Sequence, residues 1–171
     1  VNIVEAIRRS NDIFFYKVGQ WVGIEKLAKW AGKLGYGRKT EVDLPGEKEG
    51  LVPRPEWKEK VKGESWFLGD SFITAIGQGN LLATPIQVNN MTSTVANNGE
   101  FCHPQVKKGK TKCETIDISE RHLNLVRKGL REVCSEGGTA YPFFDFKPEV
   151  GCKTGTAEAS GEKALPHAWF T

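Results

Sequence analysis

The sequence predicts an α+β fold that is mainly helical, with one hairpin and the start of an antiparallel sheet near its C-terminal end. Three observations support this prediction. Amphipathic runs with capping signals occupy most of the chain, and turn signals bracket a strand–turn–strand stretch over residues 101–118. Residues Val150–Ala157 start with a short apolar segment and are interpreted as a strand.

The N-terminal part of the chain is predicted to hold three helices with a polar break after the first. Residues 1–9 form a short helix, and Ser10-Asn11-Asp12 interrupts it because these side chains compete for backbone hydrogen bonds. Helical patterns then cover 13–23 and 24–35, each of which ends at a glycine.

The middle of the chain begins with a long irregular connection, residues 36–66, whose prolines mark turns. A helix start follows at Thr84, Pro85 and Gln87, which supply an N-cap, a first-turn proline and a capping-box side chain. We expect this helix to run to about Asn97.

The remaining elements are a hairpin, a helix, a turn and a strand. The hairpin covers 101–118, and Ser119 caps a helix that runs to about Cys134. The segment 137–140, GGTA, forms a turn before the strand Val150–Ala157.

Composition indicates a soluble globular protein. Apolar residues make up 39% of the chain, charged residues 26%, and the net charge is only +3. That weak basicity does not indicate nucleic-acid binding, and we interpret the lysines of residues 107–112 as a solvated hairpin tip. The start of the chain has neither signal-peptide architecture nor an initiator methionine, so we expect a fragment.

The cysteines Cys102, Cys113, Cys134 and Cys152 form no C-x-x-C pair. A zinc site with His103 is one alternative, but the spacings match no standard ligand set, and we expect no metal. Cys102 and Cys113 flank the lysine-rich turn, so a disulfide between them is possible in an oxidising compartment. Cys152 is expected in the core and is a poor candidate nucleophile.

The segment Lys153-Thr154-Gly155-Thr156 follows the apolar start of the predicted strand. A phosphate-binding loop requires glycine directly before the lysine, and Cys152 holds that place, so we do not expect a nucleotide-binding loop here. One interpretation is a strand that lines a cleft, with Lys153 supplying charge and Gly155 permitting close approach of another backbone. The alternative is an ordinary surface strand.

A second motif favours the cleft. Serine acyl-transfer enzymes that act on D-amino-acid peptides and β-lactams combine S-x-x-K, then S-x-N or S-D-N, then K-T-G. A serine hydroxyl needs a base, a second serine relays a proton to the leaving amine, and the K-T-G strand supplies positive charge and an oxyanion donor. Ser10-Asn11-Asp12 and Lys153-Thr154-Gly155 match the second and third elements in order.

The two motifs and the sequence between them resemble a known protein family. The segments SNDIFFYKVG, WAGKLGYGRKTEVDLPGE, WFLGDSFITAIGQGNLLATPIQ, VANNGEF, GGTA, CKTGTA and HAWF resemble, in the same order, the transpeptidase domain of class B penicillin-binding proteins. The elongation-type group, penicillin-binding protein 2 of the rod-shape machinery, is the nearest match. The resemblance implies the penicillin-binding protein and serine β-lactamase-like fold and a peptidoglycan D,D-transpeptidase that β-lactams acylate, without a cofactor.

The resemblance also implies roles for single residues. Ser10 is similar to the relay serine, and Lys153 to the lysine that bonds it and attracts the substrate carboxylate. Asp12 stands where many relatives have asparagine, which changes a neutral group into one that can be charged. The expected substrate-binding residues are Asn11, Thr154, Gly155 and Thr156, and the hydroxyl and N–H of Thr156 would contact the carboxylate and the oxyanion.

The nucleophile is expected outside this chain. In the family, S-x-x-K precedes the relay serine, whereas the S-x-x-K string of this chain, Ser160-Gly161-Glu162-Lys163, follows the K-T-G strand. It sits in a loop-like stretch with no helix to hold serine and lysine one turn apart, so we interpret it as a chance match. We therefore expect 1–171 to be a partial transpeptidase domain, truncated at both ends and inactive alone.

The resemblance further implies D-Ala-D-Ala stem peptides, β-lactams and a membrane glycosyltransferase as partners. It implies a location on the extracytoplasmic, periplasmic face of the inner membrane, with an N-terminal anchor outside this chain. Two alternatives stay open: a non-catalytic penicillin-recognising or scaffold domain of the elongation complex, and a serine β-lactamase or β-lactam sensor.

Overall fold

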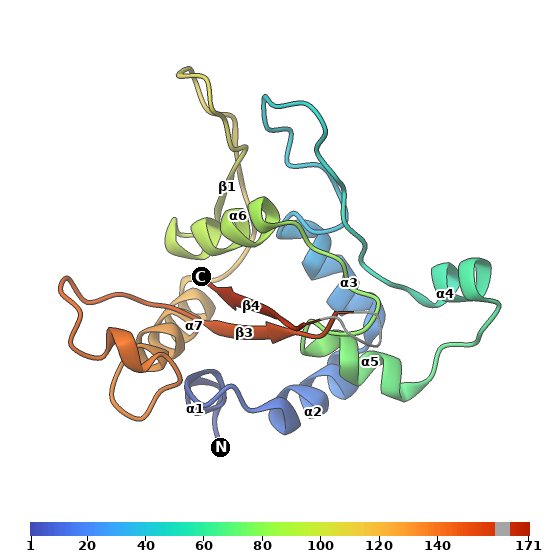
Figure 1. Ribbon diagram of the computed structural model, residues 1–171, viewed down its shortest axis with the longest axis horizontal. Helices are drawn as coiled ribbons and strands as arrows, with labels where there is room; N and C mark the ends of the chain where they lie inside the picture. Colours follow the sequence, from blue (N-terminus) through green and yellow to red (C-terminus); the bar gives the residue numbers. More distant parts are fainter. Residues whose placement is uncertain (160–164) are drawn as a thin grey trace. The chain divides into compact units, whose positions relative to one another are not determined.

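The computed structural model describes residues 1–159 and 165–171, and its contacts divide the chain into two compact units. The first unit combines Val1–Phe15 with Ile118–Thr171, and the second is Tyr16–Asp117. The described residues form mainly helices, together with two small antiparallel sheets (Figure 1), which confirms the predicted α+β class.

The first unit is built on two helices, α1 (Ile3–Arg8) and α7 (Glu120–Val133). Ser119 caps α7 as predicted, because its hydroxyl accepts the N–H of His122. Close packing of the two helices requires Gly129, since a Cβ there would lie 2.9 Å from the Cβ of Ile7. The other elements are a short 3-10 turn, η1 (Tyr141–Phe143), and the strands β3 (Thr154–Ala157) and β4 (His167–Phe170).

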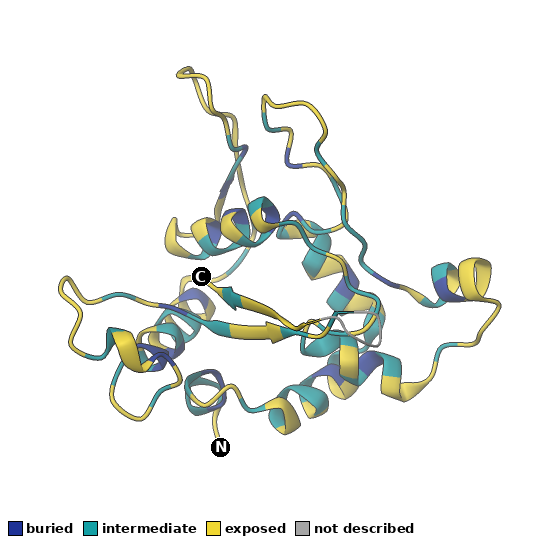
Figure 2. Cartoon of the chain, in the orientation of Figure 1, coloured by how far each residue is buried: buried dark blue, intermediate teal, exposed yellow. Residues whose placement is uncertain are grey.

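The core of the first unit is small and contains a disulfide. Ile7, Val133 and Ala140 are buried with Cys134 and Cys152 (Figure 2), and these two cysteines are bonded to each other. The core position of Cys152 confirms the prediction, but its bond to Cys134 was not foreseen.

The predicted strand Val150–Ala157 is shorter in the structure, because β3 begins only at Thr154. Residue 152 turns toward α7: its N–H donates to the carbonyl of Leu130 at 3.1 Å, and its sulfur bonds Cys134. The disulfide and this hydrogen bond replace the ladder that a longer strand would make. β3 then pairs with β4 in antiparallel register, with Gly155 opposite Trp169.

The second unit is mostly helical. It contains most of α2 (Asp12–Val22), whose first turn belongs to the first unit, and then α3 (Ile24–Lys33), α4 (Pro55–Lys62), α5 (Leu68–Ala75) and α6 (Pro85–Ala96). The strands β1 (Glu100–Cys102) and β2 (Cys113–Thr115) form the predicted hairpin.

The prediction of an irregular connection over 36–66 is wrong at its C-terminal end, where α4 forms. Pro55, read as a turn marker, is the first residue of α4, and Gly63 ends the helix in a left-handed conformation. The helix α5 was not predicted. Its N-terminus is held by Asp70, whose carboxylate accepts the N–H of Phe67 and the ammonium of Lys58, each at 2.8 Å.

A buried amide joins two loops of the second unit to α6. Gln87 completes the predicted capping box with Thr84, and it is fully buried. Its side-chain nitrogen also donates to the carbonyls of Arg38 and Glu49, both at 2.8 Å. The segment 38–49 is therefore held on the N-terminus of α6 by a side chain whose donors and acceptor are all used.

The hairpin is cross-linked and held by a carboxylate. Cys102 and Cys113 face each other in register and form a disulfide, as the sequence allowed. At the tip, Asp43 accepts the backbone N–H groups of Val106 and Lys107, which lowers the pKa of its carboxyl. The lysines of residues 107–112 are exposed, which agrees with the predicted solvated tip.

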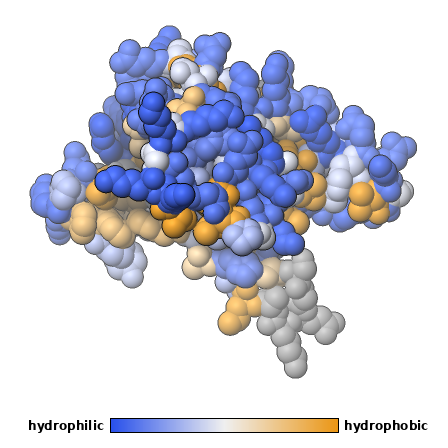
Figure 3. Space-filling view, turned by 90° about the horizontal axis from the view of Figure 1, so that it is seen from above, coloured by the Kyte–Doolittle hydropathy of each residue, from blue (hydrophilic) through white to orange (hydrophobic). Residues whose placement is uncertain are grey.

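The exterior shown in Figure 3 is mainly hydrophilic, with smaller hydrophobic patches. Exposed apolar side chains include Val61, Phe67 and Leu68 around the start of α5. Within residues 1–159 and 165–171, no helix is both long and apolar enough to cross a membrane.

We expect Gln87→Leu to destabilise the second unit by about 2–4 kcal/mol, because three part-buried backbone groups lose the fully buried amide that pairs with them. Urea unfolding followed by tryptophan fluorescence measures this. The control is Gln20→Leu, since Gln20 is exposed and its amide oxygen accepts a hydrogen bond from the exposed Lys17 side chain. Equal stability of the two variants would contradict a role for Gln87 in joining the segment 38–49 to α6.

We expect loss of the Cys134–Cys152 disulfide to weaken the segment that precedes β3. The sulfurs are 18 positions apart, and closing a loop of that size contributes about 3 kcal/mol, or roughly a hundredfold in an equilibrium constant. Hydrogen exchange at the N–H groups of Cys152→Ala/Cys134→Ala should therefore accelerate at residues 152 and 153. The matched variant Cys102→Ala/Cys113→Ala should leave exchange at those two positions unchanged.

Candidate functional site

Ser10 lies in the break between α1 and α2, as predicted, and its backbone is left-handed with φ 51°. Few residues other than glycine adopt this conformation. The Ser10 N–H donates to the carbonyl of Ile7 at 3.1 Å, which closes the end of α1. Ser10 itself is exposed. The turn therefore directs the chain into α2 while leaving the hydroxyl available.

Asn11 and Asp12 begin α2. The amide oxygen of Asn11 accepts the N–H of Phe14 at 2.9 Å, so this side chain caps the helix. This gives Asn11 a local structural role in addition to any contact with a substrate. Asp12 lies in the first turn of α2, where the helix dipole favours a negative charge.

Lys153 stands directly before β3 and is fixed through its backbone. Its N–H donates to the carbonyl of Thr171 at 2.8 Å, and its own carbonyl accepts the N–H of Thr171 at 3.1 Å. These bonds extend the β3–β4 pairing by one residue pair. Together with the adjacent Cys134–Cys152 disulfide, they fix where the Lys153 side chain starts.

The Lys153 ammonium meets the Ser10 hydroxyl. Its Nζ donates to Ser10 Oγ at 2.9 Å, although the two residues are 143 positions apart, and to the carbonyl of Thr154 at 2.6 Å. The predicted meeting of these two side chains is confirmed. Burial lowers the pKa of Lys153, while the charge of Asp12 opposes that change.

The other residues of the K-T-G strand lie on β3. Thr154 is half-buried, and its hydroxyl bonds that of Thr139 at 2.8 Å. Gly155 and Thr156 are exposed. A Cβ at position 155 would lie 3.3 Å from the Cβ of Trp169 on β4, so the neighbouring strand is one reason for glycine here.

Two residues of this site were not predicted. Thr139 contacts Thr154, and Arg8 donates from its guanidinium to the carbonyl of Glu136 at 2.6 Å. Both belong to contacts of the segment 136–139, which overlaps the GGTA string that the sequence analysis assigned to a turn and to the family resemblance, but not to a contact with the site. The signal that was available is the GGTA string itself.

No metal centre is found in the part of the chain that the structure describes, because no group of three or more potential ligands gathers there. The alternative of a zinc site at Cys102 and His103 is wrong. Cys102 is in a disulfide, and His103 Nδ1 lies 2.9 Å from the carbonyl oxygen of Thr40.

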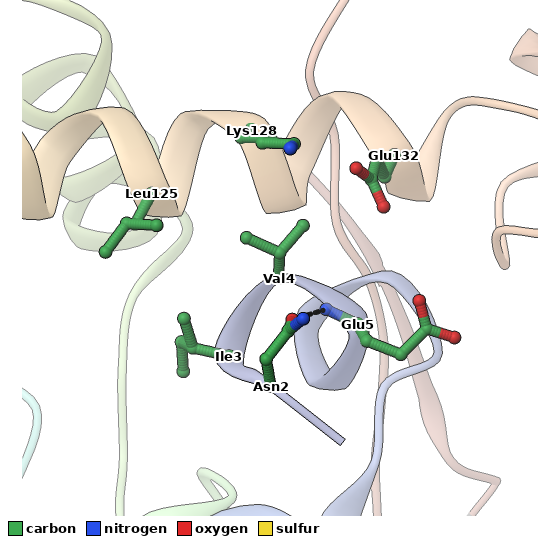
Figure 4. Close-up of a pocket in the computed structure, with 7 residues that line it drawn as sticks. All are labelled: Asn2, Ile3, Val4, Glu5, Leu125, Lys128 and Glu132. Carbon is green, nitrogen blue, oxygen red and sulfur yellow. Dashed lines mark hydrogen bonds between the residues drawn. The ribbon is translucent and has the colours of Figure 1, made fainter.

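A hollow of about 430 Å³ lies between α1 and α7 (Figure 4). Val4 on α1 points toward α7, from which Lys128 and Glu132 project, and the Asn2 side chain caps α1 through the N–H of Glu5. Neither Ser10 nor Lys153 lines this hollow, so it is separate from the candidate site. The string Ser160–Lys163 lies outside the described residues.

Chemically, the site joins a hydroxyl to an ammonium. Such a pair stabilises negative charge that develops at the hydroxyl and can pass a proton through it. The half-buried ammonium also attracts an anionic group near β3.

Comparison with known proteins identifies relatives along the whole chain. The family described as the penicillin binding protein transpeptidase domain matches residues 1–171. A relative from Acinetobacter baumannii, named peptidoglycan D,D-transpeptidase MrdA, is 42% identical over 99% of this chain and 29% of its own length. This chain spans 28–30% of the length of such relatives.

Solved structures agree with this. In the complex between penicillin-binding protein (PBP2) and MreC from Helicobacter pylori, the similar chain is 41% identical, with a TM-score of 0.88 over 99% of this chain and 33% of that one. A structure described as showing structural coordination of polymerization and crosslinking by a peptidoglycan synthase complex gives 32% identity and a TM-score of 0.89, over 99% of this chain and 30% of that one.

A family match over every residue, the fold, and the sequence identity to PBP2 and MrdA proteins together place the chain. It belongs to the transpeptidase domain of the PBP2/MrdA-type class B penicillin-binding proteins.

Proposed function

We propose that the protein containing this chain is a peptidoglycan D,D-transpeptidase that works through a serine ester. The observation that carries the proposal is the 2.9 Å bond from Lys153 Nζ to Ser10 Oγ, in a chain of this family. The A. baumannii relative is named for the same activity, which supports the proposal.

In the proposed reaction, a serine oxygen attacks the carbonyl between the two D-alanines of a stem peptide. The serine proton passes to a base in the S-x-x-K segment as the oxygen attacks. The C–N bond breaks, and the terminal D-alanine leaves after its amine gains that proton through the Ser10 hydroxyl. A neighbouring peptide amine then attacks the ester, loses a proton and releases the serine. A β-lactam enters the first step in the same way, but its ring opens and no amine departs.

Lys153 serves this reaction in two ways. It has three N–H groups, and its bonds to Ser10 and the Thr154 carbonyl use two of them, so a third can donate to the substrate carboxylate. The exposed Thr156 is placed on β3 to contact the same carboxylate with its hydroxyl and an oxyanion with its N–H. We assign substrate contacts also to Asn11 and to the Thr154 and Gly155 backbone.

We further propose that residues 1–171 are part of a larger transpeptidase domain, whose nucleophile belongs to an S-x-x-K segment upstream. The fraction of the relatives that the chain spans supports this. Alone, the chain is expected to be inactive. We place the whole protein on the extracytoplasmic face of the inner membrane, and its proposed partners are an MreC-like protein and a peptidoglycan polymerase, by analogy with the two solved complexes.

We expect the full-length protein to gain one penicillin mass, carried by the serine of the upstream S-x-x-K segment. Intact-mass and peptide mass spectrometry measure this. Lys153→Ala should reduce the acylation rate constant by about 100-fold, since it removes the charge that attracts the carboxylate and stabilises the transition state. The control Ser160→Ala should acylate as the wild type does.

Other outcomes identify other functions. A folded protein that gains no mass would be a non-catalytic recognition or scaffold domain. Rapid hydrolysis of a chromogenic β-lactam, without a lasting adduct, would identify a β-lactamase. Mapping of the adduct to Ser10 or Ser160 would contradict the assignment of the nucleophile.

We expect Asp12→Asn to move the alkaline limit of acylation to lower pH. Burial holds the pKa of Lys153 below its ordinary 10.5, and the Asp12 charge raises it, so removing that charge lowers the pKa further. The ammonium is then lost at a lower pH, and the acylation rate falls there. Acylation rates measured from pH 7 upward test this, and the exposed Asp145→Asn should leave the limit in place. A limit that rises or stays in Asp12→Asn would contradict it.

A further inference from the structure

The turn 136–139 is attached at both ends to the elements that carry Ser10 and Lys153. At one end, the Arg8 guanidinium donates to the carbonyl of Glu136 at 2.6 Å, and Arg8 closes the helix two residues before Ser10. At the other end, the hydroxyls of Thr139 and Thr154 are 2.8 Å apart, and Thr154 follows Lys153.

The turn itself is held to α7, so it is more than a flexible tether. The N–H of Ala140 donates to the carbonyl of Val133, the last residue of α7, at 3.1 Å, and the N–H of Gly138 closes the turn on the carbonyl of Ser135 at 2.8 Å. A Cβ at Gly138 would overlap the carbonyls of Glu132 and Val133. A Cβ at Gly137, whose φ is +81°, would overlap the Arg8 guanidinium. The two glycines therefore let the turn lie against both α7 and Arg8.

We propose that Arg8 and Thr139 are positioning residues, and that they act together through the 136–139 turn as a brace that sets how Lys153 meets Ser10. The contact between Lys153 and Ser10 is a single hydrogen bond between side chains, which fixes a distance but leaves rotation free. The shared core of Ile7, Val133 and Cys152 already sets roughly where the two segments lie. The brace adds a direct link from Arg8, next to the Ser10 turn, to Thr154, next to Lys153, and so restricts the rotation that the single bond leaves free.

The position of Lys153 relative to Ser10 affects the rate of the proposed reaction. Transfer of a proton through Ser10 requires its hydroxyl to be aligned with both donor and acceptor, and small displacements in such sites reduce rates steeply. This inference rests on the proposed function. The brace touches no substrate and acts only through the position of the ammonium and the hydroxyl.

The test uses the full-length protein and a penicillin, and it compares Arg8→Gln, Thr139→Val and the double variant. We expect each single change to lower the acylation rate constant by about 5–20-fold, in rough proportion to a modest misalignment. The double variant should be no slower than the slower single variant, because either change already breaks the one connection. Thr139→Ser keeps the hydroxyl and should retain the rate within about threefold.

The matched controls are Arg9→Gln and Thr111→Val. Arg9 forms an exposed ion pair with Glu5, and Thr111 is at the exposed hairpin tip. Both variants should acylate like the wild type.

A second readout separates positioning from folding. A loosened site admits water to Lys153, which weakens the effect of burial, so the alkaline limit of acylation should rise in Thr139→Val. Rates are expressed per folded molecule, with the folded fraction taken from circular dichroism.

Three results would overturn the brace: wild-type rates in both single variants, multiplied losses in the double variant, or an alkaline limit that stays fixed while only the folded fraction falls. If the wild-type protein itself forms no adduct, the proposed function fails, which is a different result.

Discussion

The half-buried ammonium of Lys153 is the constraint on which the candidate site depends. Burial disfavours the charge, so the group needs compensating partners, and it finds them in the Ser10 hydroxyl, the Thr154 carbonyl and the Asp12 charge. The fold fixes the position of Lys153 and of the partners that stabilise its charge. Ser10 adopts a left-handed backbone, Asp12 begins a helix, and Lys153 stands where a strand and a disulfide meet. Because a half-buried charge is poorly solvated, it interacts strongly with a nearby anion, and the hydroxyl, carbonyl and carboxylate around Lys153 stabilise it in the absence of one.

Local signals made much of the fold predictable. Thr84, Pro85 and Gln87 predict the start of α6 because capping chemistry is complete within four positions, and Ser119 does the same for α7. The failures are also local. A proline can end one segment or begin a helix, and Pro55 was assigned to the wrong one of these roles. The helix α5 was missed because its N-terminal anchor, Asp70, is shared with Lys58 of another helix.

Some residues of the site were predictable from sequence motifs, and others were not. Ser10 and Lys153 were predictable because the residue types and their order correspond to a known chemistry. Arg8, Thr139 and the Cys134–Cys152 bond were not, because each is defined only by contacts across the fold. The Arg8 bond spans 128 positions, and nothing near Arg8 indicates that a carbonyl will lie there. Cys134 and Cys152 match no spacing rule and become partners only because α7 ends where β3 is about to begin.

The disulfides bear on location independently of the relatives. All four cysteines lie in described residues and all are paired, and protein disulfides persist mainly in oxidising compartments. Cys134 and Cys152 are only 5% and 3% exposed, so a thiolate cannot easily reach either sulfur, and exchange requires such an attack. A small core of short side chains gains most from a permanent link. The pairing thus supports the proposed extracytoplasmic location, and it makes the segment before Lys153 a fixed support that is not sensitive to mild reduction.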